Sequence, residues 1–324
     1  MNNRLKTLGL AILVATSLIG CEKNNEQANN SLKEEATMQE GTSVNTQITV
    51  NTVKGDVVVP LQPKPIAVYD MSIMQNLVAL GVEADGLPTN LLLDTFKIKG
   101  TESADIGTVF EPNFEKVHAL KPQAIFIGGR ASSQYDELNK IAPTLDLSLD
   151  WADMYGSSLS MLTTLGNIFD KSDKASELVN DIKTVVDETK QVTTGKGNGL
   201  ILIVNGNKVT AAGAESRFGF IHNQLGIPMA DNNIEAHTHG EPVSFEYIQK
   251  TNPDWLFVLD RTSAIGQEGP GALEVLDNDL IHQTKAWQKN QIIQLSPDSY
   301  LAFGGYYQWM KDAKAIKAAF EKLN

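Results

Sequence analysis

The arginines are the residues of this sequence best suited to bind an anion. Among 27 lysines and arginines only four are arginine, and one of these, Arg4, lies near the N-terminus. The other three, Arg130, Arg217 and Arg261, each follow a strand-like run or precede a helix-like one. A guanidinium group offers a planar fork of donors that suits paired anionic oxygens and stacks on aromatic rings. We therefore expect the three to line one cleft for a multiply charged, oxygen-rich ligand; the alternative is that they form structural ion pairs.

Two of these arginines follow copies of one sequence pattern. NFEKVHALKPQAIFI, residues 113–127, and SFEYIQKTNPDWLFV, residues 244–258, share Phe, Glu, Pro and Phe at an offset of 131 residues. The same offset separates Arg130 from Arg261. In open α/β sheets ligands bind beyond the carboxyl ends of the strands. The pattern predicts two related lobes that each present an arginine there, although helix-turn-strand units of this kind are common in α/β proteins.

The elements that must position these side chains alternate along the chain. Residues 48–59 predict a hairpin that turns at Lys54-Gly55, residues 65–70 a buried strand, and residues 71–81 a helix that ends at Gly81. Such alternation predicts largely parallel sheets. Residues 157–192 lack proline and repeat apolar side chains at helical spacing, which predicts one long helix, with a bend near 170–174 as an option.

The predicted fold is therefore α/β, with two lobes of mainly parallel sheet joined by one long helix. We expect an N-terminal lobe over residues 46–155, the connecting helix over 156–195 and a C-terminal lobe over 196–324. A chain of 324 residues is long enough for two such cores.

The N-terminus resembles a bacterial lipoprotein signal. Arg4 and Lys6 precede an apolar run over residues 8–18 that is too short to span a bilayer, and Gly20 precedes Cys21. Cys21 is the sole cysteine, so an intramolecular disulfide and a cysteine nucleophile are both excluded. We expect residues 1–20 to be a signal peptide and the polar residues 21–45 to be a flexible tether. Lipidation of Cys21 would anchor the exported protein to the cytoplasmic membrane, on its periplasmic or outer face.

Composition and motifs exclude several functions. A net charge of −12 and a pI of about 4.9 argue against a nucleic-acid partner. The sequence contains neither a Gly-x-Ser-x-Gly elbow, nor a Walker loop, nor His-Glu-x-x-His. We therefore predict that the protein is not an enzyme, has no catalytic residue and holds no permanent cofactor.

Several features in this order resemble a known family. The cysteine motif, the polar tether, the two predicted lobes, EPNFEKVHALKPQAIFI and AHTHGEPVSFEYI together resemble the iron-siderophore substrate-binding proteins of bacterial ABC importers. The resemblance is strongest to the binders of catecholate siderophores of the enterobactin and petrobactin type. It implies a class III periplasmic-binding-protein fold and a function in iron uptake. The ligand would be a ferric siderophore complex, which the protein, expected to be a monomer, delivers to an ABC permease and its ATPase.

The resemblance also implies roles for particular residues. Arg130, Arg217 and Arg261 match the positive triad that holds the ferric catecholate. His239 and Tyr300 match a histidine and a tyrosine that fill iron positions left open by a tetradentate siderophore, although the loop of Tyr300 is one residue shorter than in some relatives. Imidazole and phenolate are both acceptable ligands of ferric iron.

The resemblance assigns a different role to two carboxylates. Glu115 and Glu246, at matching positions of the repeated pattern, correspond to carboxylates that dock on the permease. A helix-stabilising carboxylate in the first turn is the simpler reading of both.

Three alternatives remain open on the sequence alone. The same scaffold serves haem or cobalamin binders, although neither ligand obviously needs three arginines. A zinc or manganese binder usually draws several histidines and carboxylates from both lobes, whereas one of the five histidines here, His118, lies in the first lobe. A structural surface lipoprotein, such as an adhesin, is the third alternative.

Overall fold

The computed structural model describes residues 46–89, 91–93, 103–234 and 240–322. The described residues belong to one compact unit, Asn45–Asn324. The predicted signal peptide, Cys21 and the predicted tether lie outside the described residues, as does His239. Within the described part, no helix is both long enough and apolar enough to cross a membrane.

The first lobe is built on a parallel five-stranded sheet with the order β5-β4-β3-β6-β7. Its strands are β3 (Ile66–Val68), β4 (Gly86–Leu87), β5 (Ala104–Asp105), β6 (Ala124–Ile127) and β7 (Thr144–Asp146). Its helices are α1 (Met71–Leu80), α3 (Phe114–Leu120) and α4 (Tyr135–Asn139), with a short 3-10 turn η1 (Ser132–Gln134) before α4. The predicted hairpin is present as β1 (Gln47–Thr52) and β2 (Gly55–Pro60), and Gly81 ends α1 in the left-handed conformation, as predicted.

The second lobe repeats this arrangement with one difference. Its sheet has the order β10-β9-β8-β11-β12, in which β8, β11 and β12 are parallel to one another and β9 runs antiparallel to both of its neighbours, β8 and β10. The strands are β8 (Gly199–Asn205), β9 (Lys208–Ala212), β10 (Glu241–Pro242), β11 (Trp255–Asp260) and β12 (Ile292–Gln294). The helices are α7 (Phe220–Asn223), α8 (Phe245–Thr251), α9 (Arg261–Ala264), α10 (Ala272–Leu276), α11 (Lys285–Gln288), α12 (Asp298–Leu301) and α13 (Tyr306–Glu321), with a 3-10 turn η2 (Ile281–Gln283).

The repeated sequence pattern forms matching structure in the two lobes. Asn113 caps α3 and Ser244 caps α8, in each case by accepting a hydrogen bond from a backbone N–H in the first turn. Lys121 and Asn252, which are again 131 residues apart, end these helices with positive φ angles of 51° and 47°. The strands that follow, β6 and β11, occupy the same fourth place in their sheets. The predicted kinship of the two units is thus visible in their caps, turns and sheet positions.

The prediction of one long connecting helix is wrong. Two helices, α5 (Met154–Ile168) and α6 (Ser172–Thr193), are separated by Phe169, Asp170 and Lys171, and Asp170 has a positive φ of 54°. They pack so closely that a Cβ on Gly166 would lie 2.4 Å from the Cβ of Ala175. Both helices bury apolar side chains in the same core cluster, so the apolar spacing continues across the turn. The break lies at the start of the stretch where a bend was considered.

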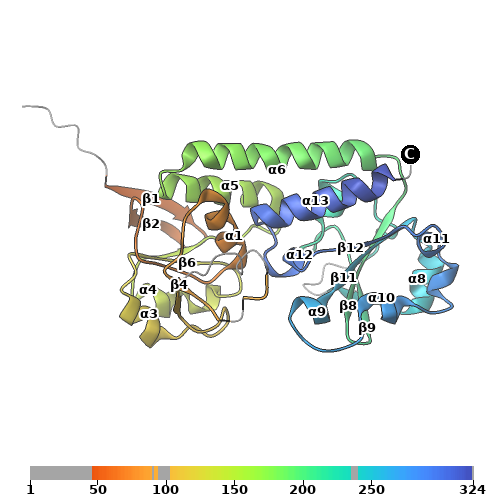
Figure 1. Ribbon diagram of the computed structural model, residues 1–324, viewed down its shortest axis with the longest axis horizontal. Coiled ribbons are helices and arrows are strands. Elements are labelled where there is room, and N and C mark those ends of the chain that lie inside the picture. Colours follow the sequence, from red (N-terminus) through yellow and green to blue (C-terminus); the bar gives the residue numbers. More distant parts are fainter. Residues whose placement is uncertain (1–45, 90, 94–102, 235–239, 323–324) are drawn as a thin grey trace, which may run out of the picture. The chain divides into compact units, whose positions relative to one another are not determined.

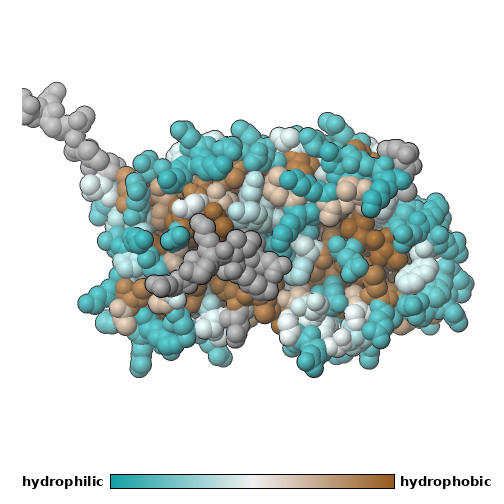
Figure 2. All heavy atoms as spheres, in the orientation of Figure 1, coloured by the Kyte–Doolittle hydropathy of each residue, from teal (hydrophilic) through white to brown (hydrophobic). Residues whose placement is uncertain are grey.

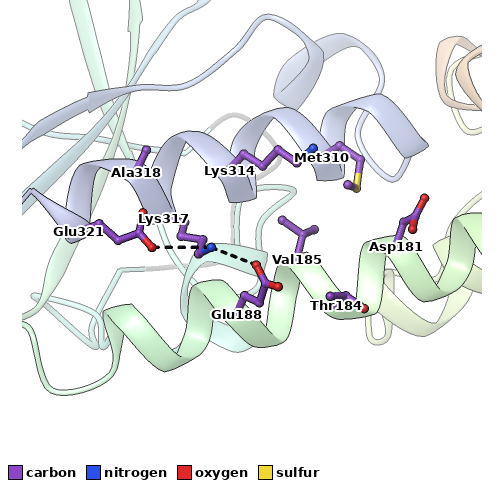
Figure 3. A pocket seen from close by; sticks show the side chains of 9 residues that line it. All are labelled: Asp181, Thr184, Val185, Glu188, Met310, Lys314, Lys317, Ala318 and Glu321. Carbon is purple, nitrogen blue, oxygen red and sulfur yellow. Dashed lines mark hydrogen bonds and ion pairs between the residues drawn. The ribbon is translucent and has the colours of Figure 1, made fainter.

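The last helix joins the lobes as well. α13 packs along α6 and against α1 of the first lobe (Figure 1). Thr189 on α6 donates to the carbonyl of Ala313 at 3.1 Å, and Lys317 on α13 lies 3.0 Å from Glu188 on α6. The groove between these helices has a volume of about 460 Å³. Figure 3 shows Lys317 of α13 pairing with Glu188 of α6 across the groove and with Glu321 on its own helix. One hydrophobic cluster accordingly runs from the first sheet through α5, α6 and α13 to the second sheet.

Helix α6 has one buried face and one exposed face. Its buried residues are Ala175, Leu178, Ile182, Val185, Val186, Thr189 and Thr193. The remaining positions are mostly charged or polar, and Figure 2 shows a largely hydrophilic surface along this edge of the molecule.

Candidate functional site

The three arginines singled out by the sequence meet around one residue, Tyr300. Arg130 follows β6 and donates to the carbonyl oxygens of Leu301 at 2.9 Å and Tyr300 at 2.7 Å. Arg217, in the loop between β9 and α7, donates to the Tyr300 carbonyl at 3.3 Å. Arg261 begins α9 and donates from Nε to the Tyr300 hydroxyl at 2.8 Å. Residues that are far apart in the sequence and belong to both lobes therefore form a single cluster, here called the arginine cluster.

The guanidinium groups also lie over the faces of two aromatic rings. The Arg217 guanidinium lies 4.8 Å from the Tyr300 ring centroid and 5.1 Å from that of Phe303. Arg130 lies 5.4 Å from the Phe303 centroid, and Arg261 lies 5.3 Å from the Tyr300 centroid. The negative face of an aromatic ring attracts a cation, so the two rings offset part of the repulsion among three like charges.

The central arginine is the most deeply buried of the three. Arg217 is 7% exposed, whereas Arg130 and Arg261 are half-buried. Burial, followed by the positive charge of Arg130, lowers the pKa of Arg217 to about 10; Tyr300 opposes this shift and Arg261 adds to it. Arg217 is therefore still a cation at neutral pH, held where an anion would be favoured.

A buried polar network fixes α12, which carries Tyr300. Asp298 accepts a hydrogen bond from Gln75 of α1 at 2.6 Å and pairs with Lys311 of α13 at 2.9 Å. Asp312 accepts from Ser299 at 2.5 Å and from Gln308 at 2.9 Å. Burial raises the pKa of the Asp312 carboxyl, while these hydrogen bonds act in the opposite direction. Because Gln75 belongs to the first lobe, the position of Tyr300 depends on both lobes.

Two glycines allow the loop after α12 to approach the first lobe. A Cβ on Gly304 would lie 2.4 Å from Leu149, and one on Gly305 would lie 2.4 Å from Oε1 of Gln75. Gly304 also has a positive φ of 84°, which disfavours other residues. The loop sequence Phe303-Gly304-Gly305 thus brings the Phe303 ring beneath the arginines.

The remaining predicted site residues lie elsewhere. Glu115 and Glu246 are exposed in the first turns of α3 and α8, at equivalent points of the two lobes. Hydrogen bonds from the backbone and from Ser244 lower the pKa of Glu246. Their positions fit a helix-stabilising role and leave both carboxylates accessible. Among the described residues, no group of three or more His, Cys, Asp or Glu side chains is arranged to hold a metal ion.

Sequence reasoning did not identify Phe303 or the two buried aspartates. Phe303 stands in a short AFGG stretch whose glycine pair was the one available signal for a close approach. Asp298 and Asp312 look like ordinary helix carboxylates in the sequence, because burial depends on tertiary packing. Trp151, in the segment between β7 and α5, stacks on Phe303 with 5.7 Å between ring centroids.

Two known proteins of similar sequence are named for the siderophores that they bind. The petrobactin-binding protein YclQ of Bacillus subtilis is 37% identical over 320 residues, which cover 97% of this chain and 98% of YclQ. The ferric-anguibactin-binding protein FatB of Vibrio anguillarum is 31% identical, over 91% of this chain and 92% of FatB.

Solved structures agree with these relatives. The crystal structure of YclQ matches 85% of this chain and 99% of its own with a TM-score of 0.81 and 38% identity. The siderophore-binding protein BauB, solved with two molecules of acinetobactin and ferric iron, matches with a TM-score of 0.77 and 30% identity, over 85% of this chain and 98% of BauB. These likenesses confirm the predicted two-lobed fold.

The family itself follows from the match along the chain. The family model described as "Periplasmic binding protein" covers residues 66–299, which include the repeated units, all three arginines and the start of α12. The predicted family is confirmed: this chain belongs to the periplasmic binding proteins.

Proposed function

We propose that this protein binds a ferric siderophore outside the cytoplasmic membrane and delivers it to an ABC permease for iron uptake. The observation that carries the proposal is the convergence of Arg130, Arg217 and Arg261 on Tyr300. Three guanidinium groups create a local positive field within a protein of net charge −12. The names of YclQ, FatB and BauB, which bind petrobactin, ferric anguibactin and ferric acinetobactin, support the class of ligand.

A catecholate siderophore fits the arginine cluster best. A ferric tris-catecholate carries several negative charges on oxygen atoms and exposes flat aromatic rings. The forks of the three arginines match the oxygens, and the rings of Tyr300 and Phe303 match the aromatic part. Haem and cobalamin, the alternatives left by the sequence, lack this concentration of charge.

Binding would require the arginines to exchange partners. Arg130 now donates to two backbone carbonyls and Arg261 to the Tyr300 hydroxyl. A ligand with anionic oxygens offers a stronger, charge-assisted acceptor than a neutral carbonyl or hydroxyl. For a tetradentate siderophore, release of the Tyr300 hydroxyl would also free its oxygen to bind iron, with His239 as the second protein ligand.

A titration series tests this proposal. The purified protein is titrated with a ferric tris-catecholate, a ferric bis-catecholate, a ferric hydroxamate, ferric citrate and haemin. We expect saturable quenching of tryptophan fluorescence and a saturable change in the visible charge-transfer band with the catecholates. A saturable shift of the Soret band with haemin and no saturation with either catecholate would overturn the assignment.

Docking on the permease is proposed for Glu115 and Glu246. One exposed carboxylate at an equivalent point of each lobe suits a transporter with two permease subunits. Reversal of both charges, with Glu115→Lys and Glu246→Lys, should leave siderophore affinity within about twofold of the wild type, since neither residue contacts the arginine cluster. Uptake of iron-55 siderophore by cells that carry the double variant should fall at least about tenfold, and each single variant should show a smaller loss. Unchanged uptake by the double variant would contradict docking at these residues.

We further propose that the mature protein is a monomer anchored through a lipid on Cys21. Relatives that are named lipoproteins support this anchor, among them YfiY of Bacillus subtilis, which is named a "probable siderophore-binding lipoprotein" and is 29% identical over 55% of this chain. A Cys21→Ala variant should appear in the medium or in the soluble fraction instead of the membrane fraction, as a cell fractionation will show.

A further inference from the structure

One large aromatic side chain beside the arginine cluster is exposed to solvent. Trp151, in the segment between β7 and α5, is 53% exposed, whereas Trp255 and Trp309 are 2% and 1% exposed. A tryptophan ring that faces water loses most of the free energy that its burial would provide. Its exposure therefore needs a reason that packing within the described residues does not supply.

The position of Trp151 connects it to the arginines. Its ring stacks on Phe303 with an interplanar angle of 28° and 5.7 Å between centroids. Phe303 in turn lies beneath Arg130 and Arg217, and Arg217 lies over Tyr300. Aromatic rings and guanidinium groups thus form a continuous stack that begins at Trp151 in the first lobe and ends at Arg261 in the second.

We infer that Trp151 is a further ligand-contacting residue, and that its indole ring packs on a catechol ring of the bound siderophore. The inference rests on the proposed function and names a residue that selects for aromatic siderophores. The arginines supply attraction for the anionic oxygens but do not distinguish a catecholate from any other multiply charged oxygen ligand. An exposed indole at the end of the stack adds a flat apolar surface that only a ligand with aromatic rings can cover well.

The competing explanation is that Trp151 only shields Phe303. In that case any large apolar side chain at position 151 would serve equally well, and the indole would remain open to solvent in the complex. The contact with a catechol ring instead requires an aromatic side chain and protects it from small quenchers when the ligand binds. The two explanations therefore differ in two independent measurements.

The first measurement compares side chains at position 151 in the full-length protein. Affinity for a ferric tris-catecholate is followed by the change in its visible charge-transfer band on binding, which does not depend on tryptophan emission. We expect Trp151→Leu to weaken binding about tenfold and Trp151→Phe by no more than about threefold. Phe110→Leu is the matched control, because Phe110 is also exposed, at 65%, in the loop before α3, and its change should alter affinity by less than about twofold.

The second measurement reports the environment of the indole itself. A gallium(III) tris-catecholate replaces the ferric complex, since gallium has the same charge and similar coordination without iron's strong quenching. Quenching of tryptophan emission by acrylamide should decrease when the gallium complex binds, and Trp151→Phe should abolish most of that decrease. The melting temperature of Trp151→Leu should stay within about 2 °C of the wild type, because the ring is half exposed.

The possible outcomes separate the contact from the proposed function. Equal affinities for the Leu and Phe variants, or an acrylamide response that the gallium complex does not change, would overturn the contact while the wild type still binds. Failure of the wild type to bind any ferric catecholate would overturn the proposed function and the contact together.

Discussion

The two lobes contain the same helix-turn-strand unit, but they use the arginine that follows it in different ways. In the first lobe Gly128 and Gly129 separate β6 from Arg130, whose guanidinium donates to the carbonyls of Tyr300 and Leu301 in the other lobe. In the second lobe Arg261 follows β11 directly, begins α9, and donates to the Tyr300 hydroxyl within its own lobe.

This difference shows what a repeat preserves. The caps, the left-handed turns and the position of the arginine at the end of a central strand are the same in both copies. The partners of the arginines are not equivalent, because α12 lies in the other lobe for Arg130 and in the same lobe for Arg261. Arg130 therefore links the lobes, while Arg261 orients a side chain within one of them.

Removal of either arginine should have the largest effect. We expect Arg130→Ala and Arg261→Ala each to weaken binding of a ferric tris-catecholate about 100-fold, since each removes a charge-assisted fork. The Lys variants should lose only about tenfold, because the charge survives without the planar fork. Isothermal titration measures both. The two Ala variants should also differ in stability. Arg130→Ala removes hydrogen bonds between the lobes, whereas Arg261→Ala does not, so Arg130→Ala should lower the melting temperature further. Equal melting temperatures would contradict the linking role of Arg130.

Tyr300→Phe should distinguish the contribution of Arg261 from that of Arg130. The change removes the hydroxyl that accepts from Arg261 and leaves the carbonyls that accept from Arg130. If the hydroxyl oxygen also binds iron, affinity for a tetradentate ferric siderophore should fall about tenfold, and that for a hexadentate one by less than about twofold. Identical losses with both classes, measured by fluorescence titration, would argue against ligation of iron by Tyr300.

The second link between the lobes is tested at Gln75. Gln75→Ala removes the donor to Asp298 and leaves a buried carboxylate oxygen with one partner fewer, so we expect a loss of about 2 kcal/mol in the free energy of unfolding. Affinity should fall about fivefold because α12 is held less firmly. Gln62→Ala, at an exposed position, is the control and should change neither value by a comparable amount. Urea denaturation and titration measure the two quantities, and a stability loss with unchanged affinity would show that α12 keeps its place without Gln75.

The smallest expected effect is a dependence on pH. The pKa of Arg217 is about 10 in the free protein, and a bound anion favours the charged form, so the complex holds this proton more tightly than the free protein does. Affinity should therefore fall as the pH rises through 10, by about fourfold between pH 8 and 10.5. Arg217→Gln, which cannot titrate, should bind more weakly and lack this part of the dependence. A slope that persists unchanged in the variant would assign the titration to another group.

The sequence predicted most of the fold and that the three arginines lie together. The reason is that local signals govern both: alternation of strands and helices, glycine at the end of α1, and the common offset of Arg130 and Arg261. The convergence on Tyr300 also agrees with the prediction that the three side chains meet at one place.

What the sequence did not reveal depends on packing between distant segments. The turn at Asp170 is hidden because α5 and α6 bury their apolar residues in one core. Gln75 and Asp298 are 223 residues apart, and nothing in the sequence indicates that the side chain of Gln75 donates a hydrogen bond to that of Asp298. The position of the Phe303 ring next to the arginines depends in the same way on the close approach of Gly304 and Gly305 to the first lobe.

The return of α13 to the first lobe bears on how the molecule can be divided. A cut in the loop after α6, near residue 195, would give an N-terminal fragment without the helix that covers α6 and α1, and a C-terminal fragment with an uncovered apolar face on α13. Neither piece should be soluble and ordered by itself. When the two fragments are coexpressed, they should reassemble. A split reporter built at this loop would then report binding of the siderophore, because a bound ligand should strengthen the association of the fragments.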